Sequence, residues 1–149
     1  MLNAPGLMDP STEFGSMMQH AMKIKGAQME QDRKKFEVWP QFLQNSMWER
    51  NETTLKLREL PPAERLEGAA ALKDEGNELF KKKKYTSAVE LYEAAVGSFV
   101  YAKQLDLDWK KKGIKDETIE LIDERGDDAD KEKIEAFLES CYNNLAACY

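Results

Sequence analysis

The sequence has little of several residue types on which common functions depend. It contains one histidine and two cysteines among 149 residues. No cluster of histidine, cysteine and carboxylate residues has the ligand spacing of a metal site. A glycine-rich phosphate-binding motif is also missing, as is a pairing of a nucleophile with a base. We therefore expect no enzymatic activity, no cofactor and no bound metal.

The chain has no excess of positive charge and no long apolar run. Its formal net charge is -6, which argues against a nucleic-acid-binding protein because such proteins are usually basic. No apolar stretch approaches the roughly 20 residues that span a membrane as a helix. The first residues also lack the charged and apolar segments of a secretory signal. We expect a cytoplasmic protein, with the nucleus also open, and no nucleic-acid or membrane partner.

The two cysteines, Cys141 and Cys148, lie seven residues apart in one predicted helix. Seven residues make about two helical turns, or roughly 10 Å, which is too far for a disulfide bond. We therefore expect both to be small buried apolar side chains of a reducing compartment.

Residues 1–17 include the dipeptides Glu-Phe and Gly-Ser, which translated cloning sites commonly leave behind. We interpret this stretch as a vector-derived tag and leave it out of the functional argument. On this interpretation the natural chain starts at Met17 or Met18.

Residues 18–60 are predicted to form an N-terminal helical arm. Large apolar side chains recur there at steps of three and four residues, which marks one helical face. They are Phe42, Leu43, Met47 and Trp48. The simplest interpretation is that this face packs on the helices that follow. The alternative is a segment that binds a partner or a second copy of the chain.

Pro61 and Pro62 mark a boundary, because proline cannot continue a helix but is well suited to its first turn. The pattern after them predicts a helix over about residues 63–83 and a second helix over about residues 85–105. Lysines 81–84 lie at the negative end of the first helix dipole. They are expected to be a solvated helix end, or alternatively a cluster that attracts an acidic peptide at range.

Side chains of defined size recur along these two helices. The first helix presents a large, a small and a large residue, and the second a small, a large and a small one. They are Leu72, Gly76, Leu79, Ala88, Tyr92 and Ala95. Small residues at Gly76 and Ala88 allow two antiparallel helices to approach closely, while the large side chains fill the space around them. This order is more specific than the amphipathic pattern of an ordinary helical hairpin.

Residues 106–130 are strongly polar, and Gly113 and Gly126 interrupt them. This composition predicts a solvated insertion. A few apolar residues within it are compatible with a short helical piece: Ile114, Ile119, Leu121 and Ile122.

Helical periodicity returns over residues 131–149. Tyr142 and Ala146 take the positions that Leu72 and Gly76 hold in the first pattern. The segment is therefore predicted to be the first helix of a second, similar unit.

The spacing of these residues resembles the 34-residue tetratricopeptide repeat (TPR). Lys73-Asp-Glu-Gly-Asn77 and Tyr142-Asn-Asn-Leu-Ala-Ala closely resemble motifs of carboxylate-clamp co-chaperones of the Hop, protein-phosphatase and FKBP-type immunophilin groups. The resemblance covers roughly residues 66–105 and 131–149. It implies an all-α fold: a first repeat at residues 61–105 with an extended second helix, the insertion, and the first helix of a second repeat.

The family binds the C-terminal Glu-Glu-Val-Asp tail of cytosolic heat-shock chaperones, and its peptide-carboxylate-binding roles fall on Lys73, Asn77 and Asn144. Lys73 and Asn77 are four residues apart and share one helical face. An ammonium and a carboxamide there are suited to holding the two oxygens of a terminal carboxylate. The family usually adds basic residues from a third repeat, so the clamp is expected to be incomplete in this fragment.

A second hypothesis is a structural module that self-associates and binds no peptide tail. Repeat proteins cover their apolar faces with neighbouring repeats. We therefore expect the face of Tyr142, Leu145 and Tyr149 to be exposed and to be a possible homo-oligomer contact. A clamp predicts binding that requires a free C-terminal carboxylate, whereas self-association predicts a mass that depends on concentration.

Overall fold

The computed structural model describes residues 11–48, 51–126 and 128–149, without the side chains of residues 29, 30 and 128. The first ten residues of the expected tag lie outside this range. The chain is mostly helical, which confirms the all-α class. Its described residues divide into two compact units, those of 11–38 with 106–119 and those of 39–105 with 120–149.

The first unit consists of short helical pieces and one longer helix. They are α1 (Glu13–Asp32), α2 (Lys34–Val38), α7 (Trp109–Lys112) and the 3₁₀ helix η1 (Asp116–Thr118). The Asp116 carboxylate accepts hydrogen bonds from the backbone N–H groups of Lys35 (2.8 Å) and Phe36 (3.0 Å). Asp116 thereby satisfies two donors at the start of α2 that have no partner within the helix.

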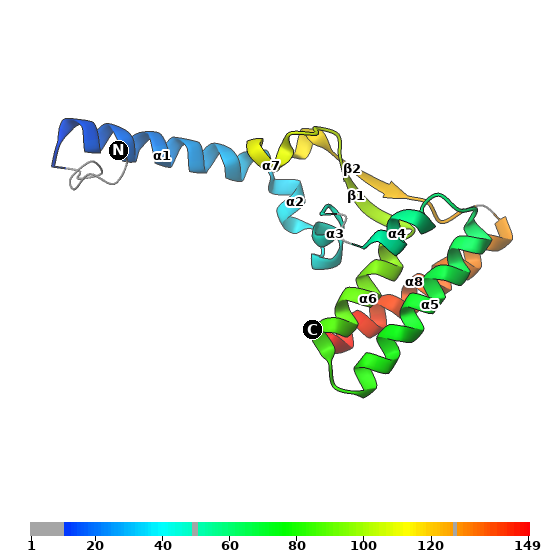
Figure 1. Cartoon of the computed structure of the whole chain (residues 1–149). Helices are drawn as coiled ribbons and strands as arrows, with labels where there is room; N and C mark the ends of the chain where they lie inside the picture. Colours follow the sequence, from blue (N-terminus) through cyan, green and yellow to red (C-terminus); the bar gives the residue numbers. More distant parts are fainter. Residues whose placement is uncertain (1–10, 49–50, 127) are drawn as a thin grey trace. The chain divides into compact units, whose positions relative to one another are not determined.

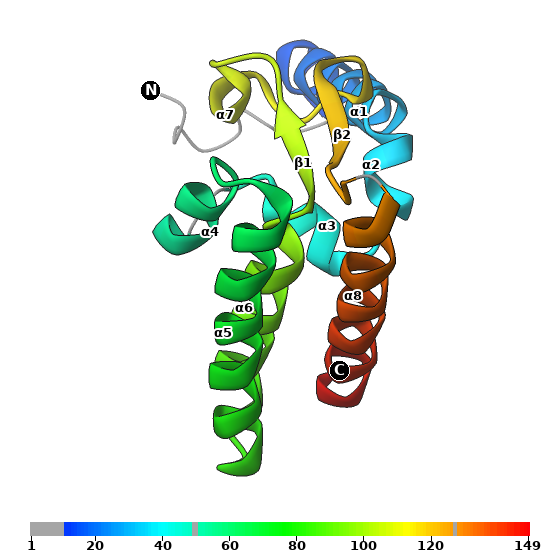
Figure 2. The same cartoon turned by 90° about the vertical axis from the view of Figure 1, so that its right-hand side faces the viewer.

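The second unit contains, among the residues that the structure describes, five helices and a two-stranded sheet, apart from the first residue of β2, Ile119. They are α3 (Gln41–Ser46), α4 (Glu52–Leu57), α5 (Pro62–Lys81), α6 (Tyr85–Gly97), α8 (Asp128–Cys148), β1 (Val100–Gln104) and β2 (Ile119–Asp123). Figures 1 and 2 show α5 and α6 side by side, with α8 running along them.

The α5–α6 hairpin is packed by small residues against a large one. Ala69, Ala88 and Ala95 have no exposed surface, and Tyr92 is 1% exposed. A Cβ atom added to Gly76 would lie only 2.8 Å from a ring carbon of Tyr92. The glycine is therefore needed for the close approach of the two helices. On α8, the residues that face inward recur at helical spacing: Ile134, Leu138, Cys141 and Leu145.

The prediction that the second helix extends to about residue 105 is wrong. Helix α6 ends at Gly97, and Val100–Gln104 form β1, which pairs with β2. Val100 and Ala102 are buried while Lys103 is exposed. This alternation follows the two-residue period of a strand, which is hard to distinguish from a helical pattern over five residues.

The insertion is more ordered than its composition predicts. The short helical piece expected around Ile119 is a strand instead, because Ile119–Asp123 form β2. Ile119 is buried, and the backbone N–H of Glu124 donates to the Phe99 carbonyl at 2.8 Å. Pairing with β1 therefore gives this stretch the backbone partners that a solvated loop would find in water.

A buried arginine joins the segments around the hairpin. Arg65 on α5 donates to the carbonyl oxygens of Arg58, Leu60 and Ser98, and its Nη1 lies 2.9 Å from the carboxylate of Glu124. Because nearly all of this side chain is buried, each of these bonds compensates for lost hydration of the guanidinium.

Helix α3 covers part of the face that we expected to be exposed. Leu43 and Met47 are buried, so this part of the arm packs on the unit, as the simpler interpretation predicted. The Phe42 ring lies 5.1 Å from the Tyr142 ring. Leu145 is 2% exposed, and the expectation for it was therefore wrong. Tyr149 is 64% exposed, as expected.

Candidate functional site

Two amides that are distant in the sequence meet between α5 and α8. Asn144 Nδ2 donates a hydrogen bond of 3.1 Å to Asn77 Oδ1, although the two residues are separated by 67 positions. The same oxygen accepts a bond of 2.7 Å from the Tyr92 hydroxyl of α6. The arrangement thus joins one side chain from each of the three long helices of this unit.

Lys73 lies four residues before Asn77 on α5. Its Nζ is 5.8 Å from the centre of the Phe137 ring of α8, a distance at which an ammonium is attracted to the face of an aromatic ring. The side chain is half-buried, and it forms no ion pair with any residue that the structure describes. Its positive charge is therefore not neutralised within the described chain.

The three side chains offer more hydrogen-bond donors than acceptor atoms that are not already used. Asn77 uses its Oδ1 for two bonds, and its Nδ2 donates to no described residue. Asn144 uses one of its two Nδ2 hydrogens, and the Lys73 ammonium has three. An anionic group with two acceptor oxygens, such as a carboxylate, is the chemical complement of such a set.

Sequence reasoning proposed Lys73, Asn77 and Asn144 for the site but gave no role there to Tyr92 or Phe137. Tyr92 was assigned only to repeat packing, yet its hydroxyl contacts Asn77. A signal for this was present, because a tyrosine buried among alanines needs a hydrogen-bond partner for its hydroxyl. Phe137 lies in the helix predicted over residues 131–149, but it was not singled out there.

The remaining residues predicted to pack the repeats have different environments. Leu72 is buried and Leu79 is half-buried, whereas Ala146 is exposed. Ala146 follows Leu145, and successive helical residues point about 100° apart. Because Leu145 faces inward, Ala146 points away from the core and is not buried against another helix, as its predicted packing role requires. Asn143 is likewise exposed.

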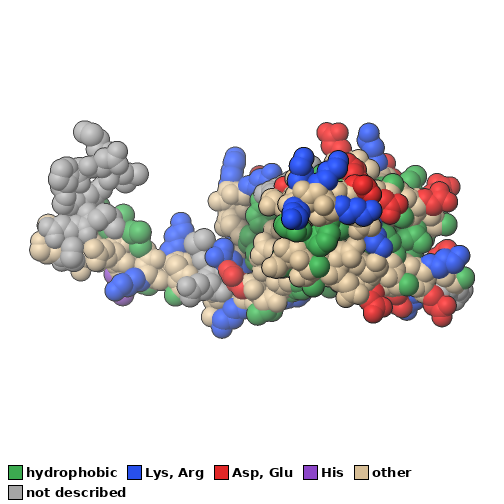
Figure 3. All heavy atoms as spheres, turned by 90° about the horizontal axis from the view of Figure 1, so that it is seen from below, with side chains coloured by type: hydrophobic (Ala, Val, Ile, Leu, Met, Phe, Trp, Pro, Cys, Tyr) green, Lys and Arg blue, Asp and Glu red, His purple; other side chains and the backbone are tan. Residues whose placement is uncertain are grey.

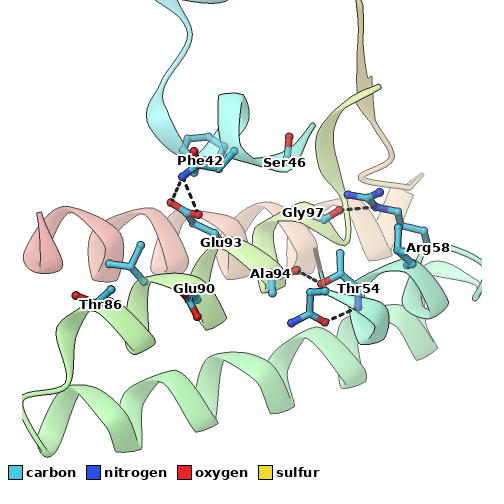
Figure 4. A pocket seen from close by; sticks show the side chains of 13 residues that line it. Phe42, Ser46, Thr54, Arg58, Thr86, Glu90, Glu93, Ala94 and Gly97 are labelled. Carbon is cyan, nitrogen blue, oxygen red and sulfur yellow. Dashed lines mark hydrogen bonds between the residues drawn. The ribbon is translucent and has the colours of Figure 1, made fainter. Parts of the chain in front are cut away.

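A separate pocket of about 410 Å³ lies between α3, α4 and α6 (Figure 4). Its wall on α6 includes Val89, Glu90 and Glu93. The Glu93 carboxylate accepts bonds from Asn45 Nδ2 (3.1 Å) and from the Tyr149 hydroxyl (2.8 Å). None of the three clamp residues predicted from the sequence lines this pocket.

Lysines 81–84 are all exposed at the turn between α5 and α6. Lys83 has a backbone φ of 61°, the left-handed conformation with which many helices end. Lysine and arginine side chains gather on the face of the molecule shown in Figure 3, beside acidic ones. The lysines at this turn are thus available to solvent, as predicted.

Both cysteines are free thiols. Burial raises the pKa of Cys141 to about 12, so this thiol stays protonated at neutral pH.

Among the described residues, no three or more histidine, cysteine or acidic side chains are grouped to hold a metal ion. Nor does any helix in that part of the chain have the length and apolar character to span a membrane.

Comparisons with protein-family models, with curated proteins and with solved structures find no match to this chain.

Proposed function

We propose that this protein is a TPR-type interaction module, a co-chaperone adaptor that binds the C-terminal Glu-Glu-Val-Asp tail of a cytosolic heat-shock chaperone. Lys73, Asn77 and Asn144 hold the terminal carboxylate. The observation that carries the proposal is the direct contact between Asn77 and Asn144. The sequence motifs assigned both residues to one site from segments 67 positions apart.

The chemistry of the three side chains supports the same conclusion. A terminal carboxylate offers two oxygens with about four acceptor positions, and hydrogen bonds to an ionised group are roughly twice as strong as neutral ones. Lys73 supplies a charge without an ion-pair partner in the described chain, and the two asparagines supply fixed donors. Lysines 81–84 add positive charge at the hairpin turn, which favours the approach of an acidic peptide at low salt.

The burial of Leu145 and the contact of Phe42 with Tyr142 weaken the self-association alternative. Tyr142 and Leu145 belong to the apolar face that self-association requires to be exposed. Helix α3 covers part of that face. We therefore place peptide-tail binding first.

The test is fluorescence polarisation with a labelled Met-Glu-Glu-Val-Asp peptide, alongside a copy with an amidated C-terminus. We expect saturable binding of the free acid and at least about tenfold weaker binding of the amide. The reason is that a hydrogen bond to a charged group contributes about 1.5–3 kcal/mol. Lys73→Ala and Asn77→Ala are each expected to weaken binding of the free acid by a similar factor.

Two substitutions serve as matched controls. Lys56→Ala removes an exposed lysine on α4 that has no role in the proposal, and Asn143→Ala removes an exposed asparagine beside Asn144. Both are expected to leave the affinity within about twofold, since neither side chain belongs to the proposed clamp. Equal affinity for the acid and the amide, or no saturable binding of either, would contradict the proposed function.

A further inference from the structure

We propose that Tyr92 is a positioning residue of the carboxylate clamp, because its hydroxyl turns the Asn77 carboxamide so that the amide hydrogens face the bound carboxylate. This inference rests on the proposed function and assigns a role to a residue outside the three clamp positions.

Two donors converge on a single oxygen. The Tyr92 hydroxyl lies 2.7 Å from Asn77 Oδ1, and Asn144 Nδ2 lies 3.1 Å from the same atom. Rotating the carboxamide by 180° would place Asn77 Nδ2 against the Asn144 donor and would break this bond. The two contacts thus direct Oδ1 into the unit and leave Nδ2 for a ligand.

The position of the hydroxyl is itself fixed by close packing. Tyr92 is 1% exposed, and its ring carbons would lie within 2.8–3.3 Å of a Cβ at position 76. Burial also raises the pKa of the Tyr92 hydroxyl. The group therefore remains protonated at neutral pH and acts as a hydrogen-bond donor.

The two helices of the hairpin therefore have different roles in ligand binding. Helix α5 carries the groups that touch the ligand, Lys73 and Asn77, and α6 carries the group that orients one of them. A glycine at position 76 is needed for this, since it lets the Tyr92 ring approach α5 closely. A donor whose orientation is fixed before binding loses less side-chain entropy on binding.

The test is Tyr92→Phe, which keeps the ring that packs on Gly76 and removes only the hydroxyl. We expect the affinity for the free-acid Met-Glu-Glu-Val-Asp peptide to fall by about fivefold, as for one lost neutral hydrogen bond. Affinity for the amidated peptide should not change, so the ratio of the two affinities should fall. In an Asn77→Ala background, Tyr92→Phe should cause no further loss.

Tyr101→Phe is the matched control, because Tyr101 also donates its hydroxyl to a polar side chain, that of Glu124. It should leave the ratio unchanged. The inference would be overturned if Tyr92→Phe left the ratio of free-acid to amide affinity unchanged. It would also be overturned if Tyr92→Phe weakened binding of the free acid equally in the Asn77→Ala background.

A second readout requires no ligand and therefore separates this inference from the proposed function. In the free protein, Tyr92→Phe should shift the side-chain amide resonances of Asn77 and bring its two Nδ2 protons closer in chemical shift as the carboxamide rotates. Unchanged Asn77 resonances would overturn the positioning role. Absence of peptide binding by the unsubstituted protein would instead overturn the proposed function.

Discussion

Helix α6 contacts α5 and α4 in very different ways. Toward α5, it packs Tyr92 against Gly76 at close approach. Toward α4, it accepts hydrogen bonds at its backbone, since Thr54 Oγ1 donates to the Ala94 carbonyl (2.9 Å) and Arg58 Nε to the Gly97 carbonyl (2.8 Å). Figure 4 shows both of these bonds beside the pocket.

The difference shows which kind of contact the sequence predicts. Packing of a large side chain on a glycine depends on residue size at fixed helical spacing, and both can be read from the sequence. A bond from a side chain to a backbone carbonyl depends on the docking of two segments, and nearly any residue supplies the carbonyl. The first contact was predicted, and the second was not.

The largest expected effect comes from changing the glycine in the close contact. Gly76→Ala should lower the free energy of unfolding by about 1–2 kcal/mol, because the new methyl group overlaps the buried Tyr92 ring. Gly97→Ala is the matched change at the other contact of α6, where a Cβ would meet Arg58 and Thr54 at an ordinary 3.6 Å. This change should not lower the free energy of unfolding and should raise it by at most about 1 kcal/mol.

Urea unfolding followed by circular dichroism measures both changes. If Gly97→Ala lowered the free energy of unfolding as much as Gly76→Ala, the contacts of α6 with α5 and with α4 would not differ in the way described.

A smaller effect is expected from the hydrogen bond on the α4 side. Thr54→Val keeps the shape of a buried side chain and should cost about 1 kcal/mol, the usual net value of one hydrogen bond. The loss is limited because the Ser98 hydroxyl also donates to the Ala94 carbonyl. Thr53→Val, at an exposed neighbour, should change stability by less than about 0.5 kcal/mol. Equal losses in the two variants, measured by thermal unfolding, would contradict this assignment.

The smallest effect is expected at the turn that joins the two helices. Lys83 has a positive φ, so Lys83→Gly should raise the free energy of unfolding by about 0.5 kcal/mol. Glycine removes the strain of the left-handed backbone but loses more conformational entropy on folding than lysine does. The estimate is the difference between these two free energies. Lys82 has an ordinary φ of -82°, and Lys82→Gly should lower stability instead. A gain of stability in Lys82→Gly, or a loss in Lys83→Gly, would show that this turn differs from the description.

The sequence predicted the parts of the fold that repeat at helical spacing. The helices α5 and α8 begin and end within a few residues of their predicted bounds, and Gly76 contacts Tyr92. The end of α6 was missed because Val100–Gln104 become a strand only through pairing with β2. That partner lies beyond the insertion, and no local pattern in five residues reveals it.

The candidate site was predicted to a similar extent. The motifs placed Lys73 and Asn77 on one face of a helix, and the structure adds the bond from Asn144. The hydroxyl of Tyr92 could have been suspected from burial, but its partner could not be read from the sequence, because it depends on the rotation of α6 against α5. Packing of the Phe42 face on the following helices was the simpler interpretation from the sequence, but its particular partner, Tyr142, depends on docking of the arm and was not predicted.

The measurement that tests the central claim most directly is a side-chain amide NMR titration with the unlabelled Met-Glu-Glu-Val-Asp peptide. We predict that the Nδ2 resonances of Asn77 and Asn144 shift together in a saturable way with the free-acid peptide. Those of the exposed Asn143 should stay in place, and the amidated peptide should cause no shift. If the Asn77 and Asn144 resonances stayed unmoved, or moved equally with the amidated peptide, these residues would not be a carboxylate clamp.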